Sequence, residues 1–157
     1  EQGERDLLTK LNNRNRFEID RDLHEEWCRH SLACIYLDVN GLHELNNREG
    51  HEAGDRMLCL VAQLIGETFG GRFAYRIGGD EFVVLVPDME RAKTERLFEE
   101  LKAKLEANGV SASLGMDRSM DVTAITPIIR RAEQAMFDDK RRHYEQADGD
   151  GRGEPRA

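Results

Sequence analysis

The fold is decided around residues 73–86, which read Phe73-Ala74-Tyr75-Arg76-Ile77-Gly78-Gly79-Asp80-Glu81-Phe82-Val83-Val84-Leu85-Val86. Two apolar, β-prone runs flank a Gly-Gly-Asp-Glu core, and a glycine pair between such runs predicts a tight β-hairpin. The glycines allow positive φ angles and leave the backbone bare, so a bulky anion such as a phosphate can approach Gly78 and Gly79. The two acidic residues would lie at the tip of this hairpin.

The acidic tip of the hairpin has two interpretations. Adjacent carboxylates at Asp80 and Glu81 repel each other. A divalent cation such as Mg²⁺ would relieve that repulsion, because it prefers oxygen ligands and shares them with phosphates. The alternative is an ordinary acidic turn, since short turns of Gly and Asp are common in α/β chains. Spacing alone leaves both interpretations open.

Length, hydropathy and charge indicate one soluble domain. The 157 residues suffice to bury a core, and no apolar run approaches the roughly 20 residues of a membrane span. A formal charge of −8 argues against a large surface for a nucleic-acid polymer or an anionic membrane, because either would need a basic excess. We therefore expect no nucleic-acid polymer and no membrane contact, and a polyanionic substrate bound locally by a metal ion and a few cations.

The cysteines and the start of the chain bear on its location. Cys28, Cys34 and Cys59 are odd in number and lack the paired spacing of a zinc site or a disulfide framework. We expect them to be reduced core thiols in a cytoplasmic protein.

The chain has no signal peptide and opens on Glu1-Gln2-Gly3 without an initiator methionine. We interpret it as a fragment of a longer protein, whose missing N-terminal part could carry a membrane anchor.

Apolar periodicity predicts the other elements of the chain. Helices are expected over about residues 14–29 and 42–49, from residue 51 onward, from Pro87-Asp88 to Asn108-Gly109, and from Thr126-Pro127 to a basic end at residues 140–143. Strands are expected over residues 32–37 and 110–115.

Asp38 follows the apolar run of residues 32–37, so we expect it at the end of a buried central strand. A carboxylate there is well placed to meet the acids of a neighbouring hairpin, and together they would supply the oxygens of a metal site. The alternative is a simple turn through Asp38-Val39-Asn40-Gly41 at the end of the strand.

Asn46 and Asp55 lie on the polar side of the two helices near residue 50. An amide and a carboxylate suit guanine, because the carboxylate accepts from the N1–H and N2–H₂ edge while the amide donates to or accepts from the purine. Adenine would leave the carboxylate unpaired. The alternative for each residue is helix capping, which Asn and Asp favour.

Several ordered motifs of this chain resemble those of the GGDEF domains, whose members are diguanylate cyclases. Gly78-Gly79-Asp80-Glu81-Phe82 looks like the signature of the family, and Asp6-Leu7-Leu8-Thr9-Lys10-Leu11-Asn12-Asn13-Arg14 looks like its opening motif. The segment from Asn46 through Gly50-His51-Glu52-Ala53-Gly54-Asp55 is similar to its nucleotide-binding segment. The resemblance covers about residues 4–144.

The resemblance implies an α+β fold similar to that of nucleotidyl cyclases. Its central sheet would be palm-like, mainly antiparallel and five-stranded, with helices on its flanks and the signature on a β-hairpin. The elements expected from the residues agree with this arrangement. Residues 1–146 would form the GGDEF catalytic domain, and residues 147–157, rich in glycine, would be a disordered tail.

The resemblance also implies a reaction, the condensation of two GTP molecules into cyclic di-GMP, a bacterial second messenger, and two pyrophosphates. One ribose 3′-oxygen would attack the α-phosphate of the other GTP in line, pyrophosphate would leave, and a metal ion would stabilise the developing charge. Because each domain supplies half of the reaction, two domains must face each other. We expect a homodimer that forms through the missing N-terminal module.

The family's site residues carry over onto this chain position by position. Asp38 and Asp80 would hold Mg²⁺ or Mn²⁺ with the backbone carbonyl of Val39, and Glu81 would help to ionise the attacking hydroxyl group. The substrate-binding positions would be Asn46 and Asp55 for guanine, with His51 nearby, and Lys140 for phosphate.

Two positions depart from the family pattern. Where the family has a phosphate-side lysine this chain has His43, a candidate catalytic residue whose imidazole, with an unperturbed pKa near about 6.5, is a weaker fixed charge. Lys140 matches a lysine of the last helix, yet the arginine expected four residues later is Tyr144. Arg141 or Arg142 could take the place of that arginine, or triphosphate affinity could be reduced.

Two other functions and one absent site complete the expectations. A degenerate domain that binds GTP as a regulatory module would normally lose its metal acids, which are present here. A cyclase with a mixed or adenine product would be expected to change Asp55. Product inhibition through an Arg-x-x-Asp motif would need Arg at position 69 and Asp at position 72, where this chain has Phe69 and Arg72, so we expect no such site.

Overall fold

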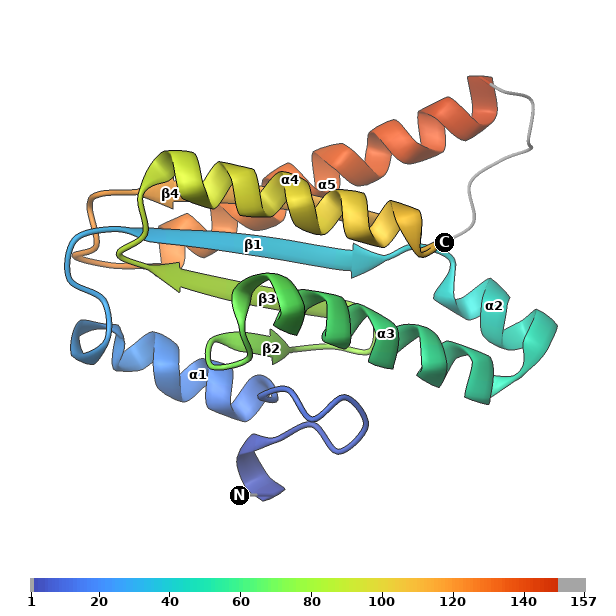
Figure 1. Cartoon of the computed structure of the whole chain (residues 1–157), viewed down its shortest axis with the longest axis horizontal. Helices are drawn as coiled ribbons and strands as arrows, with labels where there is room; N and C mark the ends of the chain where they lie inside the picture. The colour runs from blue at the N-terminus through green and yellow to red at the C-terminus, as the bar shows by residue number, and fades with distance from the viewer. Residues whose placement is uncertain (1, 150–157) are drawn as a thin grey trace.

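A central β-sheet with helices on both faces organises the computed structural model, which describes residues 2–149. The elements follow in the order η1 (Gln2–Glu4), α1 (Arg14–Asp22), η2 (His24–Glu26), β1 (Leu32–Val39), α2 (Leu42–Glu49), α3 (His51–Phe69), β2 (Ala74–Arg76), β3 (Glu81–Pro87), α4 (Arg91–Ala107), β4 (Ala112–Ser119) and α5 (Thr126–Gly149). In Figure 1, α3 and α4 lie in front of the strands and α5 lies behind them.

The sheet has four strands within residues 2–149, in the order β2-β3-β1-β4, and every neighbouring pair is antiparallel. The expected antiparallel α+β architecture is confirmed, but the expected number of five strands is wrong. The N-terminal turn, residues 5–12, lies beside β2 but adds no strand to the sheet. It forms only isolated bridges, one between Asn12 and Tyr75 of β2 and one between Asn12 and Arg5 within the turn. After β4 the chain enters α5 and remains helical to Gly149, so no described segment returns to the free edge of β4.

Strand β1 is buried on both faces and divides the core into two layers. Its side chains alternate, so that Ala33, Ile35 and Leu37 face the layer of α3 and α4, whereas Leu32, Cys34 and Tyr36 face the layer of α1 and α5. The first layer also contains Leu58, Val61, Ile65, Leu101 and Leu105, and the second contains Phe17, Tyr75, Ile128, Ala132 and Met136. The strand that carries Asp38 is therefore fixed from both sides.

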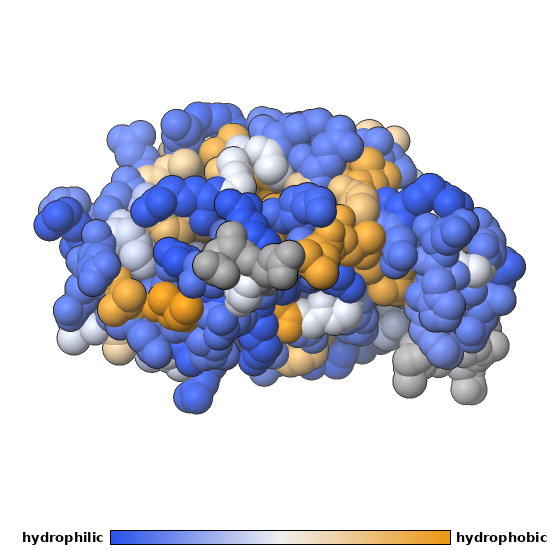
Figure 2. Space-filling model, turned by 90° about the horizontal axis from the view of Figure 1, so that it is seen from below, coloured by the Kyte–Doolittle hydropathy of each residue, from blue (hydrophilic) through white to orange (hydrophobic). Residues whose placement is uncertain are grey.

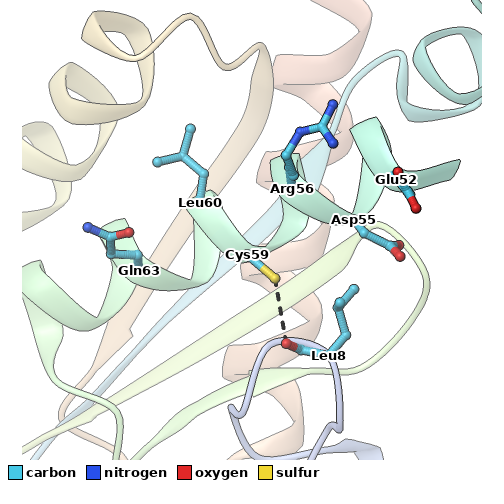
Figure 3. A pocket seen from close by; sticks show the side chains of 7 residues that line it. All are labelled: Leu8, Glu52, Asp55, Arg56, Cys59, Leu60 and Gln63. Atoms are coloured by element: carbon cyan, nitrogen blue, oxygen red, sulfur yellow. Dashed lines mark hydrogen bonds between the residues drawn. The ribbon is translucent and has the colours of Figure 1, made fainter. Parts of the chain in front are cut away.

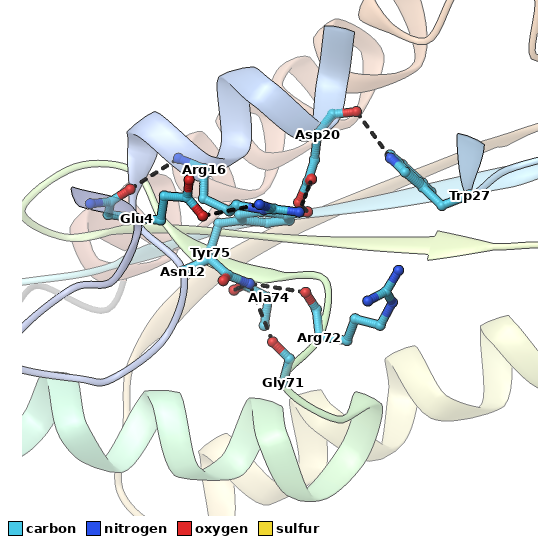
Figure 4. Close-up of polar contacts among 10 residues, drawn as sticks. Glu4, Asn12, Arg16, Asp20, Trp27, Gly71, Arg72, Ala74 and Tyr75 are labelled. Atoms are coloured by element: carbon cyan, nitrogen blue, oxygen red, sulfur yellow. Dashed lines mark hydrogen bonds and ion pairs between the residues drawn. The ribbon is translucent and has the colours of Figure 1, made fainter. Parts of the chain in front are cut away.

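Helix α1 ends at Asp22, well before the expected end at residue 29. The cause is a set of bonds to Asp20, shown in Figure 4. The Trp27 indole N–H donates to the main-chain carbonyl of Asp20 at 3.1 Å, and the buried Tyr75 hydroxyl donates to its carboxylate at 2.6 Å. These bonds hold the end of α1 against β2 and fold Trp27 back, so the chain turns toward β1 instead of extending the helix.

Helix α4 begins at Arg91 rather than at the expected Pro87-Asp88. Pro87 is the last residue of β3, and Asp88 has φ 58°, which lies outside the helical region. The Asp88 carboxylate accepts hydrogen bonds from the backbone N–H groups of residues 29–31 at 2.6–3.2 Å. Asp88 thus ties the end of β3 to the chain that enters β1.

Other boundaries differ less from those expected. The helix over residues 42–49 is confirmed as α2, and the hairpin within residues 73–86 is formed by β2 and β3. Strand β1 continues beyond Asp38 to Val39, and β4 covers residues 112–119 rather than 110–115. Helix α5 includes residues 147–149 of the expected tail, and residues 150–157 of that tail lie outside the described residues.

The surface below α1 and the N-terminal turn is mainly hydrophilic, as Figure 2 shows, with hydrophobic residues in a few separate areas. Large hydrophobic side chains are exposed at Leu7, Leu23, Met120 and Phe137. None of the helices within residues 2–149 combines the length and the apolar character that a membrane span requires.

Candidate active site

Three acidic side chains meet where β1 and β3 run side by side. Asp38 of β1 pairs with Glu81 of β3 in the antiparallel register, and the Val39 N–H donates to the Asp80 carbonyl at 2.9 Å. As a result, one carboxylate oxygen from each of Asp38, Asp80 and Glu81 lies within 4.8 Å of the others. The sheet register therefore brings together acids that are far apart in the sequence.

Asp38 is the buried member of this cluster, with 3% of its surface exposed. Its Oδ2 atom accepts a hydrogen bond from Lys140 Nζ of α5 at 2.8 Å, whereas its Oδ1 atom has no hydrogen-bond partner among the described residues. Burial, helped by the charge of the nearby Asp80, outweighs the opposing hydrogen bond and charge of Lys140, so the pKa of Asp38 is raised to about 6. Asp38 thus keeps one buried oxygen available to a cation.

The acidic cluster fits a divalent cation with a preference for oxygen. A buried carboxylate oxygen without a partner is costly unless a ligand completes its bonding. Asp80 and Glu81 are partly exposed, so an ion and its remaining ligands can reach the cluster from solvent. Mg²⁺ and Mn²⁺ both suit such a set of carboxylates.

Glu81 lies beside the β1 residue Tyr36, whose hydroxyl donates to Glu81 Oε1 at 3.4 Å. Burial raises the pKa of Glu81, and the negative charges of Asp80 and Glu133 raise it further. A carboxylate with a raised pKa is the better proton acceptor near neutral pH. Neither Tyr36 nor Glu133 belongs to a sequence motif, and their proximity to Glu81 follows from the packing of β1, β3 and α5.

The loop of Gly78 and Gly79 is close to the acidic cluster but differs from expectation in its backbone. Neither glycine has a positive φ angle, so their conformational freedom is not what the turn requires. Gly79 has open space where a Cβ atom would be, and a Cβ atom on Gly78 would lie 3.5 Å from Glu81 Oε1. The glycines therefore serve the turn through their bare backbone, which leaves room for a large anion.

An arginine just before the loop fixes its position, and the sequence analysis missed its role. Arg76 Nη1 binds both carboxylate oxygens of Asp6 at 3.2 Å, and Arg76 Nη2 donates to the Gly79 carbonyl at 2.9 Å. The guanidinium group, with Nη1 on Asp6 and Nη2 on Gly79, connects the N-terminal turn to the hairpin tip. Opposite charges at positions 6 and 76 were the only signal in the sequence, and they do not by themselves indicate a pair.

The expected guanine-binding residues lie on α2 and on the first turns of α3. Asn46 packs over Gly54, where a Cβ atom would come 1.9 Å from Asn46 Oδ1. That oxygen is buried and has no hydrogen-bond partner among the described residues. The side chains of Asp55 and His51 are exposed. Helix capping does not account for this unpaired amide oxygen.

A cavity of about 490 Å³ adjoins this segment, between α3 and the N-terminal turn (Figure 3). Asp55 lies at the end of the cavity near the start of α3, and Leu8 of the turn forms the opposite wall. The Cys59 thiol also lines it and donates to the Leu8 carbonyl at 3.5 Å. All three cysteines were expected in the core, which is confirmed for the buried Cys28 and Cys34 and wrong for Cys59, which is only half-buried. The cavity has the size and the mixed lining of a site for a small planar ligand.

Lys140 and His43, the two candidates for binding phosphate, differ in their distance from the acidic cluster. Lys140 contacts the acidic cluster directly, whereas His43 is exposed on α2 and its Nε2 atom pairs with Asn47 Nδ2 at 3.2 Å. Burial acts to lower the pKa of Lys140, but the hydrogen bond and charge of Asp38 outweigh it and raise the pKa, with a further contribution from Tyr144. Lys140 is therefore a stable cation at the cluster.

Three comparisons with known proteins agree on one family. The sequence model described as "Diguanylate cyclase, GGDEF domain" matches residues 4–146. The chain is 26% identical over 151 residues to diguanylate cyclase DosC of Escherichia coli (strain K12). This match covers 87% of this chain and 33% of that protein. The chain is 28% identical over 153 residues to a diguanylate cyclase of Vibrio cholerae, and that match covers 87% of this chain and 46% of that protein.

The fold has a counterpart among solved structures. The GGDEF domain of DgcB from Caulobacter crescentus, solved in complex with c-di-GMP, matches with a TM-score of 0.78 and 24% sequence identity, and the match covers 88% of this chain and 90% of that one. At this identity the likeness establishes the fold. The chain spans between a third and a half of the length of the curated relatives it matches.

Proposed function

Because the chain belongs to the GGDEF domain family of diguanylate cyclases, we propose that it condenses two GTP molecules into cyclic di-GMP and two pyrophosphates. The observation that carries this proposal is the acidic cluster of Asp38, Asp80 and Glu81, whose ligand oxygens lie within 4.8 Å of one another and include a buried oxygen without a partner. A protein that only packs these strands together would have no reason to bury an unpaired carboxylate oxygen there.

Asp38 and Asp80, with the backbone carbonyl of Val39, would hold Mg²⁺ or Mn²⁺. When bound, such an ion supplies positive charge that offsets the charge developing on the phosphate oxygens. The bare loop at Gly78 and Gly79 leaves room for those phosphates beside the acids.

Glu81 is the proposed proton acceptor for the attacking 3′-hydroxyl group. Its raised pKa favours uptake of a proton near neutral pH, and the Tyr36 hydroxyl holds one of its oxygens. The hydroxyl proton would pass to Glu81 as the 3′-oxygen attacks the α-phosphate of the second GTP, and pyrophosphate would leave from the opposite side.

Lys140 and His43 are the proposed phosphate-side residues. Lys140 Nζ binds Asp38 at 2.8 Å, so it would exchange that carboxylate for phosphate oxygens when substrate is bound. His43 would contribute a positive charge only when protonated, and it would first leave its partner Asn47. Both requirements predict weaker triphosphate binding than a free lysine would give.

Asn46 and Asp55 are the proposed readers of guanine. The unpaired Asn46 Oδ1 atom can accept from a base N–H group, and the exposed Asp55 carboxylate can accept both donors of the guanine edge. The cavity beside Asp55 would receive the base, with His51 at the start of the same helix. Because adenine lacks these donors, the site should prefer GTP to ATP.

Two chains must face each other for this reaction, since each domain would present one GTP. We propose a homodimer formed through sequence beyond this chain. The partners would be GTP and a second copy, without a nucleic-acid polymer or a membrane, as the charge of −8 favours.

The test is to incubate the chain with GTP and Mg²⁺ or Mn²⁺ and to separate the nucleotide products by chromatography. We expect slow formation of cyclic di-GMP, with a rate per molecule that rises with protein concentration. Asp80→Asn should abolish turnover and leave the circular dichroism spectrum unchanged, because the amide keeps the shape but not the charge. Turnover that is independent of concentration, or an Asp80→Asn variant with full activity, would contradict the proposal.

A second candidate is a regulatory domain that binds GTP without turnover. The exposed His43, which stands in place of the family lysine, and the Lys140 contact with Asp38 favour it. Calorimetry separates the two functions. Tight GTP binding without any cyclic product at the highest protein concentration would identify the regulatory domain.

A further inference from the structure

Tyr36 presents a hydroxyl group beside the acidic cluster from within the core. Its side chain is 6% exposed and lies in the core layer that faces α5. Its partners across the sheet are Val83 on β3 and Gly115 on β4, and the glycine has no side chain that could crowd the ring. The position of the hydroxyl is therefore set by the rigid centre of the sheet.

The hydroxyl binds the carboxylate that the proposed reaction uses as a proton acceptor. Tyr36 Oη donates to Glu81 Oε1 at 3.4 Å. The same Glu81 oxygen faces the bare backbone of Gly78, where a Cβ atom would lie 3.5 Å away. Glu81 thus has the Tyr36 hydroxyl on one side and the bare backbone of Gly78 on the other, so the hydroxyl is the group that orients this oxygen.

Helix α5 packs against the core layer that contains Tyr36. A phenolic hydroxyl carries one proton, which it can donate to a carboxylate. In this structure the Tyr36 hydroxyl donates that proton to Glu81 Oε1.

We propose that Tyr36 is a positioning residue, which orients the Glu81 carboxylate toward the attacking 3′-hydroxyl group. The inference rests on the proposed function of Glu81 and adds to it a residue outside the signature and the other motifs. A carboxylate held in one orientation loses less rotational freedom when it takes up a proton during the reaction. Without the hydroxyl, Glu81 would still be present but would adopt more orientations.

The alternative is that Tyr36 has only a structural role in the core. Tyr75 provides a matched control for this alternative. Tyr75 is 0% exposed, lies in the same core layer, and donates its hydroxyl to a carboxylate, that of Asp20, at 2.6 Å. Asp20 is on α1 and is not part of the acidic cluster. A structural effect of losing a buried tyrosine hydroxyl should therefore appear in both tyrosines alike.

The first measurement compares Tyr36→Phe and Tyr75→Phe in the 157-residue chain, with GTP and Mg²⁺ at the protein concentration at which the wild type is active. We expect Tyr36→Phe to lower kcat about tenfold and to change KM for GTP by less than about twofold, since the lost bond is to a charged group and orients only the reacting carboxylate. Tyr75→Phe should lower Tm but keep kcat within about twofold of the wild type.

The second measurement does not need turnover. In protein with ¹³C-labelled glutamate, without nucleotide and metal and at one fixed pH, Glu81→Gln assigns the Glu81 carboxyl carbon signal. We expect Tyr36→Phe to shift and broaden this signal, because the carboxylate loses its donor and samples more orientations. Tyr75→Phe should leave it unchanged.

The outcomes separate the two proposals. An active wild type whose kcat is unchanged by Tyr36→Phe, or reduced equally by both tyrosine variants, overturns the positioning role. If the wild type makes no cyclic di-GMP, the proposed function has failed, and the carbon signal decides about Tyr36 alone. A signal that moves only in Tyr36→Phe supports the positioning of Glu81, and a signal that stays in place overturns it.

Discussion

At the scale of single residues, Asp38 shows how a buried charge can prepare a binding site. Its two oxygens have different environments, since Oδ2 is paired with Lys140 and Oδ1 has no partner among residues 2–149. Lys140 supplies the positive charge that a buried carboxylate needs. A metal ion at Oδ1 would also supply positive charge, so it could compensate the buried carboxylate when Lys140 is lost or has moved to another partner.

This exchange predicts a stability effect that metal should reverse. Lys140→Met keeps most of the side-chain volume but leaves Asp38 buried without a partner, which we expect to cost about 1–2 kcal/mol, discounted because the lysine side chain is 28% exposed. Thermal unfolding with and without Mg²⁺ measures it. Mg²⁺ should raise Tm more in the variant than in the wild type.

Arg142→Met is the matched control for that variant. Arg142 is on the same helix and pairs with Asp139, but its side chain is 68% exposed. We expect no loss of stability and no added effect of Mg²⁺. Equal responses of both variants to Mg²⁺ would exclude Asp38 as the metal ligand.

Gly54 allows a test of Asn46 that leaves the binding residue itself intact. In Gly54→Ala the new Cβ atom would overlap Asn46 Oδ1 at 1.9 Å, so the amide must move, whereas the fold should be retained because only the end of a side chain is displaced. We expect the dissociation constant for GTP, measured by calorimetry, to rise roughly tenfold. Tm should not fall, since alanine is the better helix former.

Gly66→Ala is the control on the same helix, because a Cβ atom there has no other atom within 4 Å. It should raise Tm slightly and leave GTP binding unchanged. Asp55→Ser is the complementary variant, which should reduce the preference for GTP over ATP. If Gly54→Ala binds GTP as tightly as the wild type, Asn46 is not a reader of the base.

At the scale of elements, close backbone packing sets how near helix α5 lies to the sheet, and side-chain hydrogen bonds to the backbone set where elements begin. A Cβ atom on Gly115 of β4 would come 2.2 Å from the Met136 backbone nitrogen, so β4 and α5 are in contact backbone to backbone. This approach lets Lys140, one turn further along α5, reach Asp38. Asp88 has a comparable role at the other end of the sheet, where it binds the chain before β1.

Asp88 gives the structure a predictable dependence on pH. Burial acts to raise the pKa of Asp88, but hydrogen bonds from the backbone N–H groups of residues 29–31 outweigh it and lower the pKa. A carboxylate with a lowered pKa in the folded state stabilises the protein above its unfolded pKa of about 3.9, and this contribution is lost as pH falls through the folded pKa. Asp88→Asn should remove it.

We expect Asp88→Asn to lower the free energy of unfolding at pH 7 by about 0.5–1 kcal/mol, because Asp88 is exposed and solvent weakens the charge. Asparagine tolerates the positive φ angle of 58° at this position, so the backbone need not change. Urea unfolding at pH 7 and in acid measures the difference. A difference between wild type and variant that grows as pH falls would contradict the assignment.

At the scale of the whole molecule, the candidate residues gather at one end of the sheet. The carboxyl end of β1, the turn between β2 and β3, helix α2 and the start of α3 all lie on the right in Figure 1. The opposite end holds the entry to β1 and the loop before α5. Two copies that bring these ends together would place both nucleotides between them.

The absence of an Arg-x-x-Asp motif predicts weak regulation by product. Position 69, where the motif needs arginine, is Phe69 at the end of α3. Position 72, where it needs aspartate, is Arg72, whose guanidinium lies over the Phe73 ring, 4.6 Å from its centre. We expect no tight binding of cyclic di-GMP outside the active site. Calorimetry decides it, since submicromolar binding that survives Asp55→Ser and Asp80→Asn would require a second site.

Local sequence patterns predicted several elements and named the acidic residues of the candidate site. Alternation and apolar runs located the hairpin of residues 73–86 and helix α2, because local periodicity reports which face of an element is buried. The motifs identified the family and named the three acids that the structure brings together. These features depend on residues close to one another in the chain, which is why sequence alone could reveal them.

Features that depend on distant partners could be seen only in the folded chain. The end of α1 at Asp22, the start of α4 at Arg91 and the limit of four strands among residues 2–149 follow from contacts across the fold. The same holds for the Arg76 bond to Asp6 and the Tyr36 bond to Glu81, which join residues 70 and 45 positions apart. The physical reason is that a hydrogen bond or a steric limit is set by distance in space, and local sequence patterns carry no information about which distant groups will meet.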